Sequence, residues 1–534
     1  MAQFRLFSED DLDRLAAGVF RTLAEAGVLI QDETIRAALA KAGAMVGGPD
    51  EPVRLPRKLV EDVIAEQVRH QAEAGREPAV SARPRKPTLG TYTHVAQFFY
   101  DWRRQERRAP TVGDFLFCLR FGDVHDPDSG VGQMLLLRDF PPVMQNLEAL
   151  CLILQHANHV GCGYVHYGEQ VPYLAEMGRI WAGDPRRFLG CCIFAATPLR
   201  FDERACGVMR AMAGIGLSPP IGTMVTSGAS SPVTPAGAIV VAAAEILAGM
   251  AMQHALGAPA PRSAGIATGS LDLRRANSDF ASPEAMLQDI GVTELFDRRF
   301  GGRAGIWGCS DYTCATVPGI QAAYERCFEG MWCAIARGGQ PAFGSGLIES
   351  GKTLCLEQLL IDEEVARMSW HVARGIEVSD ETMGVSEILE IGTGSSGRTH
   401  LETEHTLRHM REAWAPALFD RGVWAGAWDG SQDRKLLDRA HEIVLATVAR
   451  YSPPSPDEAR LRAVRKLLDG AARRCGIVDC GWSGGEPGAD RWVIWRSQRP
   501  SARRPRPPCP CARPRCCGAP AAGRCARRAG PPRR

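Results

Sequence analysis

The stretch from Arg303 to Tyr324, RAGIWGCSDYTCATVPGIQAAY, decides the fold. A short apolar run is followed by a polar loop, and a helical pattern begins after Pro318. This is the pattern of a βα unit, in which the strand supplies packing and the loop at its carboxyl end carries function. We therefore predict that Trp307, Asp311 and Tyr312 lie at a functional site. A plainer interpretation makes Trp307 a core residue and Asp311 a turn or cap residue.

The same pattern recurs on both sides of this stretch. Six further apolar runs are each followed by a turn and a helical pattern: VGQMLLL (131–137), VGCGYVHY (160–167), FLGCCIFAAT (188–197), IGTMVTSG (221–228), SAGIATGS (263–270) and PAFGSG (341–346). Strands that alternate with helices and are apolar throughout predict a parallel sheet buried on both faces. Seven such units and a weaker eighth predict an α/β fold of the TIM (β/α)8 barrel type. Either Arg398 to Glu402 or a segment before Val131 could supply the eighth strand.

Three regions are predicted along the chain. Residues 1–90 form a small helical N-terminal cap region that ends in a linker rich in Pro, Gly, Arg and Lys. Residues 91–475 form the barrel with its C-terminal helices. Residues 476–534 form a basic tail, whose last 34 residues hold ten Arg and no acid. This tail is either a disordered arm or an out-of-frame extension, because Arg, Pro, Ala, Gly and Cys are what GC-rich codons encode.

Composition excludes several classes of function. The chain of 534 residues has a formal charge of +2, and without the tail its body is mildly acidic, so a nucleic-acid partner is not expected. The most apolar segment, residues 236–252, is interrupted by Glu245 and is better explained as a buried helix than as a membrane span. The N-terminus lacks the apolar core of a secretory signal. We therefore expect a cytoplasmic protein with no membrane partner.

Several stretches, in this order and at these spacings, resemble the trimethylamine methyltransferase family, corrinoid-dependent enzymes that include glycine betaine methyltransferases. The resemblance covers roughly residues 7–475. It is carried by GVLIQDETIRAALAKAGA (27–44), VRLPRKLVEDVI (53–64), FYDWRRQERRAPTVGD (99–114), SPVTPAGAIVVAAAEILAG (231–249), GCSDYTCATVPGIQAAYE (308–325), LCLEQLLIDEEVARM (354–368) and HTLRHMREAWAPALFDRGVWAGAW (405–428). It implies a TIM barrel that moves a methyl group from a methylated amine to Co(I) of a separate corrinoid protein.

Two departures from the family narrow the expected substrate. The trimethylamine enzymes have pyrrolysine at the barrel mouth, whereas every residue here is a standard one. The resemblance therefore favours the branch without pyrrolysine and a quaternary amine similar to glycine betaine. Family members often have S-D-A-K or T-D-A-K with D-x-Q-A, and of these only Asp311 and Gln321 match. The alternative is a binding protein or sensor that keeps the pocket for a methylated ammonium compound without catalysing transfer.

The chemistry implied by the resemblance selects the candidate residues. Displacing a methyl group from a quaternary ammonium releases a neutral amine, so the protein mainly has to hold a cation in line with cobalt. Aromatic faces and carboxylates attract such a cation. We predict catalytic roles for Asp311 and Tyr312, and substrate binding by Tyr100, Asp101, Trp307 and Gln321. For Tyr100 and Asp101 the alternative is a loop that packs against the barrel.

We expect no metal ligands and no cofactor held tightly by this chain. Asp123, Val124 and His125 resemble the start of the D-x-H-x-x-G motif that ligates cobalt in corrinoid-binding domains, but Asp128 stands where that motif has Gly. We interpret this segment as a polar loop. The cobalamin is then carried by the corrinoid protein. The other expected partners are the methylated amine and further copies of this chain, which would form a homo-oligomer.

Overall fold

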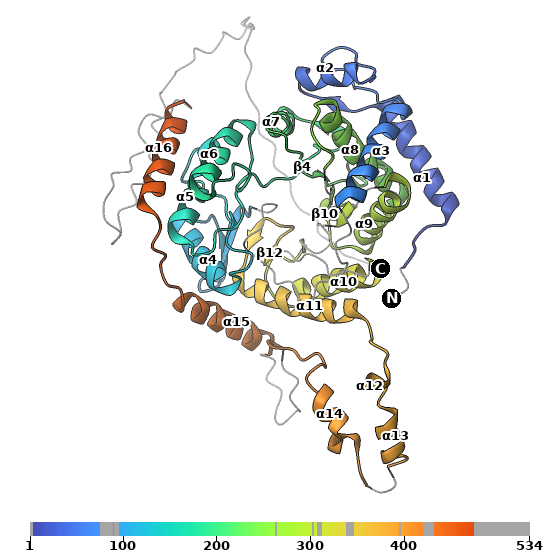
Figure 1. Ribbon diagram of the computed structural model, residues 1–534, viewed down its shortest axis with the longest axis vertical. Helices are drawn as coiled ribbons and strands as arrows, with labels where there is room; N and C mark the ends of the chain where they lie inside the picture. Colours follow the sequence, from blue (N-terminus) through green and yellow to red (C-terminus); the bar gives the residue numbers. More distant parts are fainter. Residues whose placement is uncertain are drawn as a thin grey trace, which may run out of the picture. The chain divides into compact units, whose positions relative to one another are not determined.

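The computed structural model describes residues 4–74, 89, 95–261, 264–301, 304–306, 312–337, 346–394, 397–419 and 432–474. Helices and strands alternate through this part of the chain (Figure 1). The basic tail lies outside the described residues.

The N-terminal region is helical, as predicted, and it packs on the next part of the chain. Its helices are α1 (Glu9–Arg21), α2 (Glu33–Lys41) and α3 (Arg57–Ala74). Ser8 begins α1 with a capping box, because its hydroxyl accepts from the backbone N–H of Asp11, whose carboxylate accepts from the backbone N–H of Ser8. All three helices contact α8 (Pro235–Ala255). The N-terminal helices therefore share one hydrophobic core with the helices that follow.

Four short parallel strands form the centre of the fold. They are β4 (Ile193–Phe194), β6 (Ile221–Thr223), β8 (Ala264–Ile266) and β11 (Ala304–Ile306), hydrogen-bonded in that order. Each belongs to one of the predicted apolar runs. The residues Gly222, Gly265 and Gly305 stand in register on three neighbouring strands.

Parallel neighbours continue from β4 towards the start of the chain. The backbone N–H of Val165 donates to the carbonyl of Gly190 at 2.9 Å. Parallel bridges then join Val131 to Val160 and Ala96 to Leu135. The runs VGQMLLL and VGCGYVHY form such bridges rather than longer strands.

The strand before Val131 is β2 (Phe98–Asp101), which pairs in parallel with β13 (Thr353–Leu354). One of the two candidates for the eighth strand is therefore confirmed as a strand. The other was wrong, because part of it, His400–Glu402, is a 3-10 helix. The α/β class is confirmed and the neighbours follow chain order. The pairing that would close the strands into a barrel is not among the described residues.

Shorter strands extend beyond the parallel core. β9 (Gly269–Asp272) and β10 (Asn277–Asp279) form an antiparallel hairpin, and β9 also pairs with β7 (Thr226–Ser227). β3 (Glu106–Arg108) pairs with β2, and β12 (Leu347–Ile348) pairs with β13. These strands follow the ends of the core strands and place polar residues there.

Helices follow the strands at the predicted positions. They are α5 (Pro142–His156), α6 (Val171–Ala182), α7 (Glu203–Ala213), α8, α9 (Pro283–Leu295), α10 (Ile320–Arg337) and α11 (Leu356–Arg374). Three further helices are α4 (Val112–His125), α15 (Gln432–Ala449) and α16 (Glu458–Arg474). The interpretation of Asp123, Val124 and His125 as a polar loop was wrong, because these residues form the last turn of α4, where Asp123 is buried. By length and composition α8 could cross a membrane, but 72% of its most apolar window is buried inside the protein. It is the central core helix.

The direction of α10 and α11 defines two ends of the fold. α10 begins after the loop that leaves the carboxyl end of β11, and the backbone N–H of Gly319 donates to Gln358 in the first turn of α11 at 3.2 Å. Further along, Arg326 of α10 lies 3.5 Å from Asp362 of α11. The two helices therefore run in parallel, from the carboxyl ends of the strands, here called the loop end, to the opposite end, here called the far end.

An arm follows the far end of α11. It comprises residues 376–394 and 397–410, with α12 (Asp380–Met383), α13 (Val385–Ile391) and α14 (Glu404–His409), drawn in orange shades in Figure 1. After the arm, the chain returns to α11, where the Glu364 carboxylate accepts from the backbone N–H groups of Ala417 and Leu418 at 2.9 and 2.8 Å.

Candidate functional site

The candidate site is built on residues 312–315, which follow β11 at the loop end. The carbonyls of Thr313 and Ala315 accept from the backbone N–H groups of Ser350 and Glu349, each at 2.7 Å. Ser350 and Glu349 both have positive φ, 53° and 55°, which is rare for residues with a side chain. This turn is therefore held in an unfavourable conformation by its contact with the candidate site, a feature that clusters at functional positions.

Glu325 of α10 fixes the same segment from the other side. One of its carboxylate oxygens accepts from the Thr313 hydroxyl and from the backbone N–H of Cys314, the latter at 2.8 Å. The other oxygen accepts from the Gln321 side-chain amide at 2.8 Å. Gln321 is exposed on the first turn of α10. In this structure the predicted substrate-binding Gln321 thus orients Glu325, and its role toward a substrate stays a prediction.

Tyr312, predicted to be catalytic, is buried in an aromatic pair. Its ring centroid lies 5.4 Å from that of Phe280 at an interplanar angle of 49°. A Cβ on Gly351 would lie 2.0 Å from the Tyr312 ring, and one on Gly269 would lie 3.2 Å from the Phe280 ring. Glycine at these two positions lets the backbone approach both rings closely. Gly351 also has φ +81°, which side chains rarely adopt.

A carboxylate and a thiol lie beside this aromatic pair. Asp279, at the end of β10, accepts from the backbone N–H of Ala281 at 2.9 Å and from the Cys314 thiol at 3.2 Å. Burial, followed by the neighbouring Asp279, raises the pKa of Cys314 to about 11. The Cys314 thiol is therefore protonated at neutral pH and donates to the Asp279 carboxylate. We call Asp279, Phe280, Tyr312 and Cys314 the loop-end cluster.

Asp101, predicted to bind substrate, forms an ion pair with an arginine in this structure. It accepts from Arg108 at 2.9 and 3.1 Å, and Arg108 also donates two hydrogen bonds of 2.7 Å to Asp114 at the start of α4. The hydrogen bonds to Asp114 and Asp101 raise the pKa of Arg108. Tyr100 is buried, which raises its pKa, and its ring lies 6.5 Å from that of Trp102. These hydrogen bonds connect the β2–β3 hairpin to α4. They agree with the alternative interpretation of Tyr100 and Asp101, in which both belong to a segment that packs against the barrel.

Trp307 and Asp311 lie outside the described residues. Their predicted roles stay predictions that rest on the resemblance.

A second polar group follows the run VGCGYVHY. The His166 ring lies 5.9 Å from the Tyr164 ring and 4.6 Å from the Tyr167 ring. Burial, with Arg204 adding to it, lowers the pKa of His166 to about 4, so this imidazole is neutral at pH 7. The amide oxygen of Gln170 accepts from the backbone N–H groups of His166 and Tyr167 at 2.9 and 3.0 Å. This group offers aromatic faces without adding positive charge.

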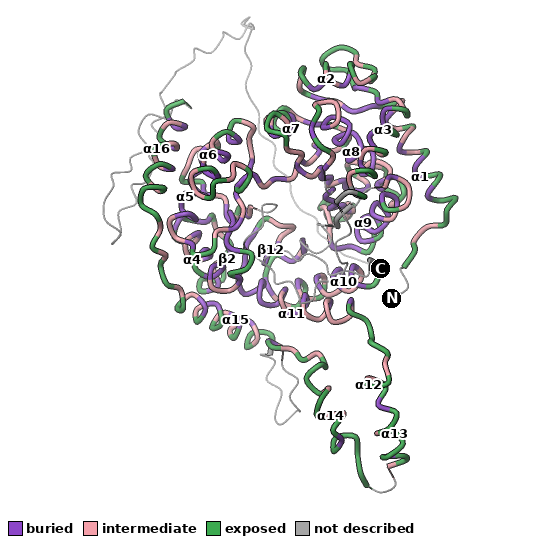
Figure 2. The backbone as a smooth tube through the Cα atoms, in the orientation of Figure 1, coloured by how far each residue is buried: buried purple, intermediate pink, exposed green. Residues whose placement is uncertain are grey.

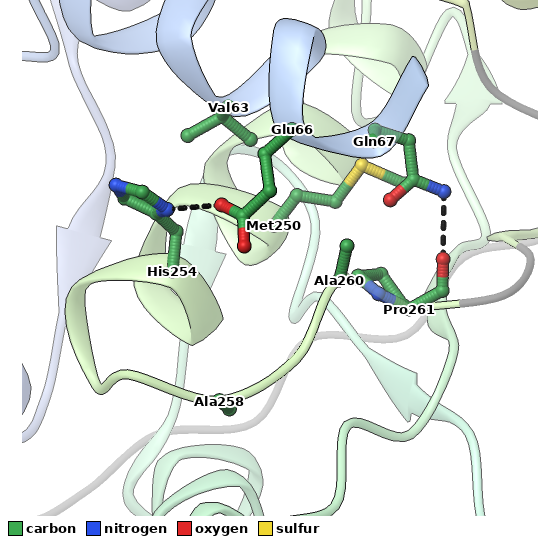
Figure 3. Close-up of a pocket in the computed structure, with 8 residues that line it drawn as sticks. All are labelled: Val63, Glu66, Gln67, Met250, His254, Ala258, Ala260 and Pro261. Carbon is green, nitrogen blue, oxygen red and sulfur yellow. Dashed lines mark hydrogen bonds and ion pairs between the residues drawn. The ribbon is translucent and has the colours of Figure 1, made fainter. Parts of the chain in front are cut away.

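A small cavity lies at the far end of α8, away from the loop end (Figure 3). His254 pairs with Glu66 of α3 on one side, and the Gln67 amide donates to the Pro261 carbonyl at 2.6 Å on the other. Its volume of about 10 Å³ is enough for roughly one water molecule. These contacts join α3 to α8, and the cavity is too small for a substrate. Among the described residues, no group of three or more His, Cys, Asp or Glu side chains is placed to hold a metal ion.

Asp279, Phe280, Cys314 and Glu325 of the candidate site were not predicted from the sequence. A signal existed for the first two, because a carboxylate and an aromatic ring stand next to each other shortly after SAGIATGS. The hairpin that folds them back over Tyr312 carries no strong turn motif, and its turn residue Ala276 has φ 51°.

The comparisons with known proteins agree with the resemblance. The trimethylamine methyltransferase family matches residues 1–475. The trimethylamine methyltransferase of Desulfitobacterium hafniense (strain DSM 10664 / DCB-2) is 27% identical over 483 residues, covering 88% of this chain and 95% of that protein. The glycine betaine methyltransferase of Desulfitobacterium hafniense (strain Y51) is 24% identical over 478 residues, covering 87% and 97%.

Among solved structures, the Methanosarcina barkeri monomethylamine methyltransferase aligns with a TM-score of 0.45 and 13% identity over 83% of this chain and 89% of that chain. The family match spans most of the chain and ends where α16 ends. The chain therefore belongs to the trimethylamine methyltransferase family and is a methyltransferase.

Proposed function

We propose that this enzyme moves a methyl group from a small quaternary or tertiary methylated amine, of the glycine betaine type, to Co(I) of a separate corrinoid protein. We also propose that the strands close into a (β/α)8 barrel whose loop end receives both reactants. The family supports methylated amines as the substrate class. The observation that carries the proposal is the loop-end cluster, where a carboxylate stands beside two aromatic rings.

The cluster suits a fixed positive charge. Aromatic faces attract a quaternary ammonium by about 0.5–2 kcal/mol each, depending on how far the contact is removed from water. Asp279 adds a half-buried carboxylate that can attract the cation. Trp307 and Asp311 remain candidates for the same site on the resemblance.

The reaction needs little proton chemistry. The electron pair of Co(I) forms the new bond to the methyl carbon, and the electron pair of the broken C–N bond stays on nitrogen. A quaternary ammonium thus leaves as a neutral tertiary amine without a general acid, and a tertiary amine would have to react as its protonated form. The chain's role is to hold the cation in line with the attacking metal. Because Cys314 stays protonated, its thiol does not compete as a methyl acceptor.

The test is methyl transfer to free Co(I) cobalamin, followed by the absorption change of the corrin. Glycine betaine, carnitine, choline, proline betaine and trimethylamine would be compared as donors. We expect transfer from at least one quaternary amine and less from trimethylamine. Binding of a quaternary amine without transfer to cobalamin or to a corrinoid protein would favour the sensor alternative. Neither binding nor transfer with any of them would contradict both.

A matched pair of variants tests the cluster itself. Asp279→Asn keeps the shape and removes the charge, so the KM for a cationic donor should rise by about tenfold, as expected for roughly 1–2 kcal/mol of lost attraction. Asp272→Asn is the control. Asp272 lies on the other strand of the same hairpin, and its carboxylate pairs with Arg275, so this variant should leave the KM unchanged. An equal change in KM for the two variants would mean that Asp279 does not bind the substrate.

A further inference from the structure

We propose that Arg107 of the β2–β3 hairpin is a positioning residue for the loop-end cluster, and that it acts through the turn at Glu349 and Ser350. This role rests on the proposed function, which places the methyl donor at the cluster. The Arg107 Nε donates to the Glu349 carboxylate at 2.5 Å. The Thr353 hydroxyl donates to the same carboxylate oxygen at 2.7 Å. The Glu349 side chain is therefore held by one cation and one neutral hydroxyl.

The strand pairing brings the hairpin and the turn together. Residues 349–352 connect β12 to β13, and β13 pairs in parallel with β2. Figure 2 shows β2 and β12, which both belong to this sheet, close together near the centre of the view. Arg107 lies on β3, the strand beyond β2, and its guanidinium carbon lies 3.4 Å from the centroid of the Phe98 ring on β2. The Phe98 ring thus directs the Arg107 side chain across β2 to the turn.

The turn lies directly against the loop-end cluster. Its backbone N–H groups donate to two carbonyls of the segment 312–315, each at 2.7 Å. A Cβ on Gly351 would lie 2.0 Å from the Tyr312 ring, and the Ser350 Oγ lies 3.9 Å from the Cys314 sulfur. Misplacing the groups that hold a reactant by about 1 Å is enough to impair a reaction. A shift of this turn would therefore disturb the surroundings of Tyr312 and Cys314.

The turn needs an anchor because its backbone conformation is unfavourable. Glu349 and Ser350 have φ of 55° and 53°, a region that residues with a side chain rarely adopt. Among the described residues, Arg107 is the cation that pairs with Glu349. The two side chains are partly exposed, at 38% and 25%, so the pair adds little to the stability of the whole fold. Loss of the pair should therefore change the geometry of the cluster and leave the melting temperature almost unchanged.

The test compares the unaltered full-length chain with Arg107→Met, which keeps an unbranched side chain but removes the charge. Methyl transfer to free Co(I) cobalamin is measured with glycine betaine and with the best other donor of the five compared above. We expect the KM for the donor to rise by about tenfold, because a misplaced site binds its ligand less well. The Tm should change by less than about 2 °C. A merely structural loss of folded protein would lower the apparent kcat and leave the KM unchanged.

Three further variants trace the effect of Arg107 to the turn. Arg107→Lys restores the charge, and its KM should lie within about threefold of the unaltered value, since the contact with Glu349 uses a single nitrogen. Glu349→Gln should raise the KM as Arg107→Met does, and the double variant should raise it no further, because both changes break the same pair. Arg104→Met is the control. Arg104 lies in the turn of the same hairpin, is 68% exposed and pairs with Glu106 at 3.5 Å, so this variant should leave the KM unchanged.

The outcomes separate this role of Arg107 from the proposed function. Methyl transfer by the unaltered chain with an unchanged KM in Arg107→Met would overturn the role of Arg107 alone. So would a KM in Arg107→Lys as high as in Arg107→Met, an equal rise in Arg104→Met, or a double variant whose KM rises by the product of the two single effects. If the unaltered chain binds a donor without transfer, the Kd from calorimetry takes the place of the KM. An unaltered chain that neither binds nor demethylates any donor would overturn both proposals.

Discussion

Asp289 of α9 is a buried carboxylate whose ionisation the fold resists. It is 1% exposed, and its Oδ1 accepts from the backbone N–H and the hydroxyl of Thr268 at 2.8 and 2.6 Å. In the described part of the chain its Oδ2 has no hydrogen-bond partner. Burial raises the pKa of Asp289 to about 7 against the opposing hydrogen bonds from Thr268. The folded state therefore binds this proton more tightly than the unfolded chain does.

This pKa predicts a direction for stability against pH. The stabilising proton is present in the folded state below the unfolded pKa of 3.8, and its contribution is lost as the pH rises from there through about 7. Asp289→Asn cannot ionise, so the difference in Tm between the variant and the unaltered protein should shift in favour of the variant between about pH 5 and about pH 8. Thermal unfolding at several pH values measures this. A difference in Tm that does not change with pH would contradict the assignment.

Tyr312 gives a second prediction at this scale. Tyr312→Leu keeps an apolar side chain but removes the aromatic face, so binding of a quaternary amine should weaken by about 0.5–2 kcal/mol. A neutral analogue with carbon in place of the ammonium nitrogen should bind almost as before. Calorimetric titration with both ligands measures the two effects. Equal weakening of both ligands would make Tyr312 a packing residue only.

Among the elements, α8 shows how closely a helix approaches the sheet. A Cβ on Gly249 would lie 2.6 Å from Ile221 of β6, whereas a Cβ on Gly207 of α7 would meet nothing within 4 Å. Gly249→Ala should therefore destabilise the protein by about 1–3 kcal/mol through overpacking. Gly207→Ala, the control, should be neutral or stabilising by up to about 1 kcal/mol, since alanine favours helix. Urea unfolding measures the free energy of unfolding of both variants. Equal changes in this free energy would mean that α8 can move away from β6.

The elements also show what the sequence can and cannot predict. Helices were predictable because each carries its own periodicity and start signals, such as Pro235 and Pro283 at the first position of α8 and α9. The strands are shorter than their apolar runs, since pairing depends on neighbours that the run does not specify. In the site, Tyr312 could be predicted from its own loop. Phe280 and Asp279 could not, because a hairpin brings them to Tyr312. Asp101 has the right charge for a cation, but Arg108, seven residues later, neutralises it.

At the scale of the whole molecule, α16 fastens the end of the described chain to α5. Arg465 donates to Glu148 at 2.7 Å and lies 3.0 Å from the Cys151 sulfur. Glu148 is buried, so Arg465→Met leaves an uncompensated carboxylate and should cost about 1–4 kcal/mol, reduced from the fully buried case because Arg465 is partly exposed. Adding Glu148→Gln should restore part of the loss. Denaturant unfolding measures both, and a double variant as unstable as the sum of the two single variants would contradict the pairing.

The parallel course of α10 and α11 has a consequence for kinetics. Because both helices run away from the loop end, the arm lies at the opposite end of the fold. A chain whose arm is altered should therefore keep the turnover rate of the unaltered chain at saturating methyl donor and acceptor, because both reactants meet at the loop end.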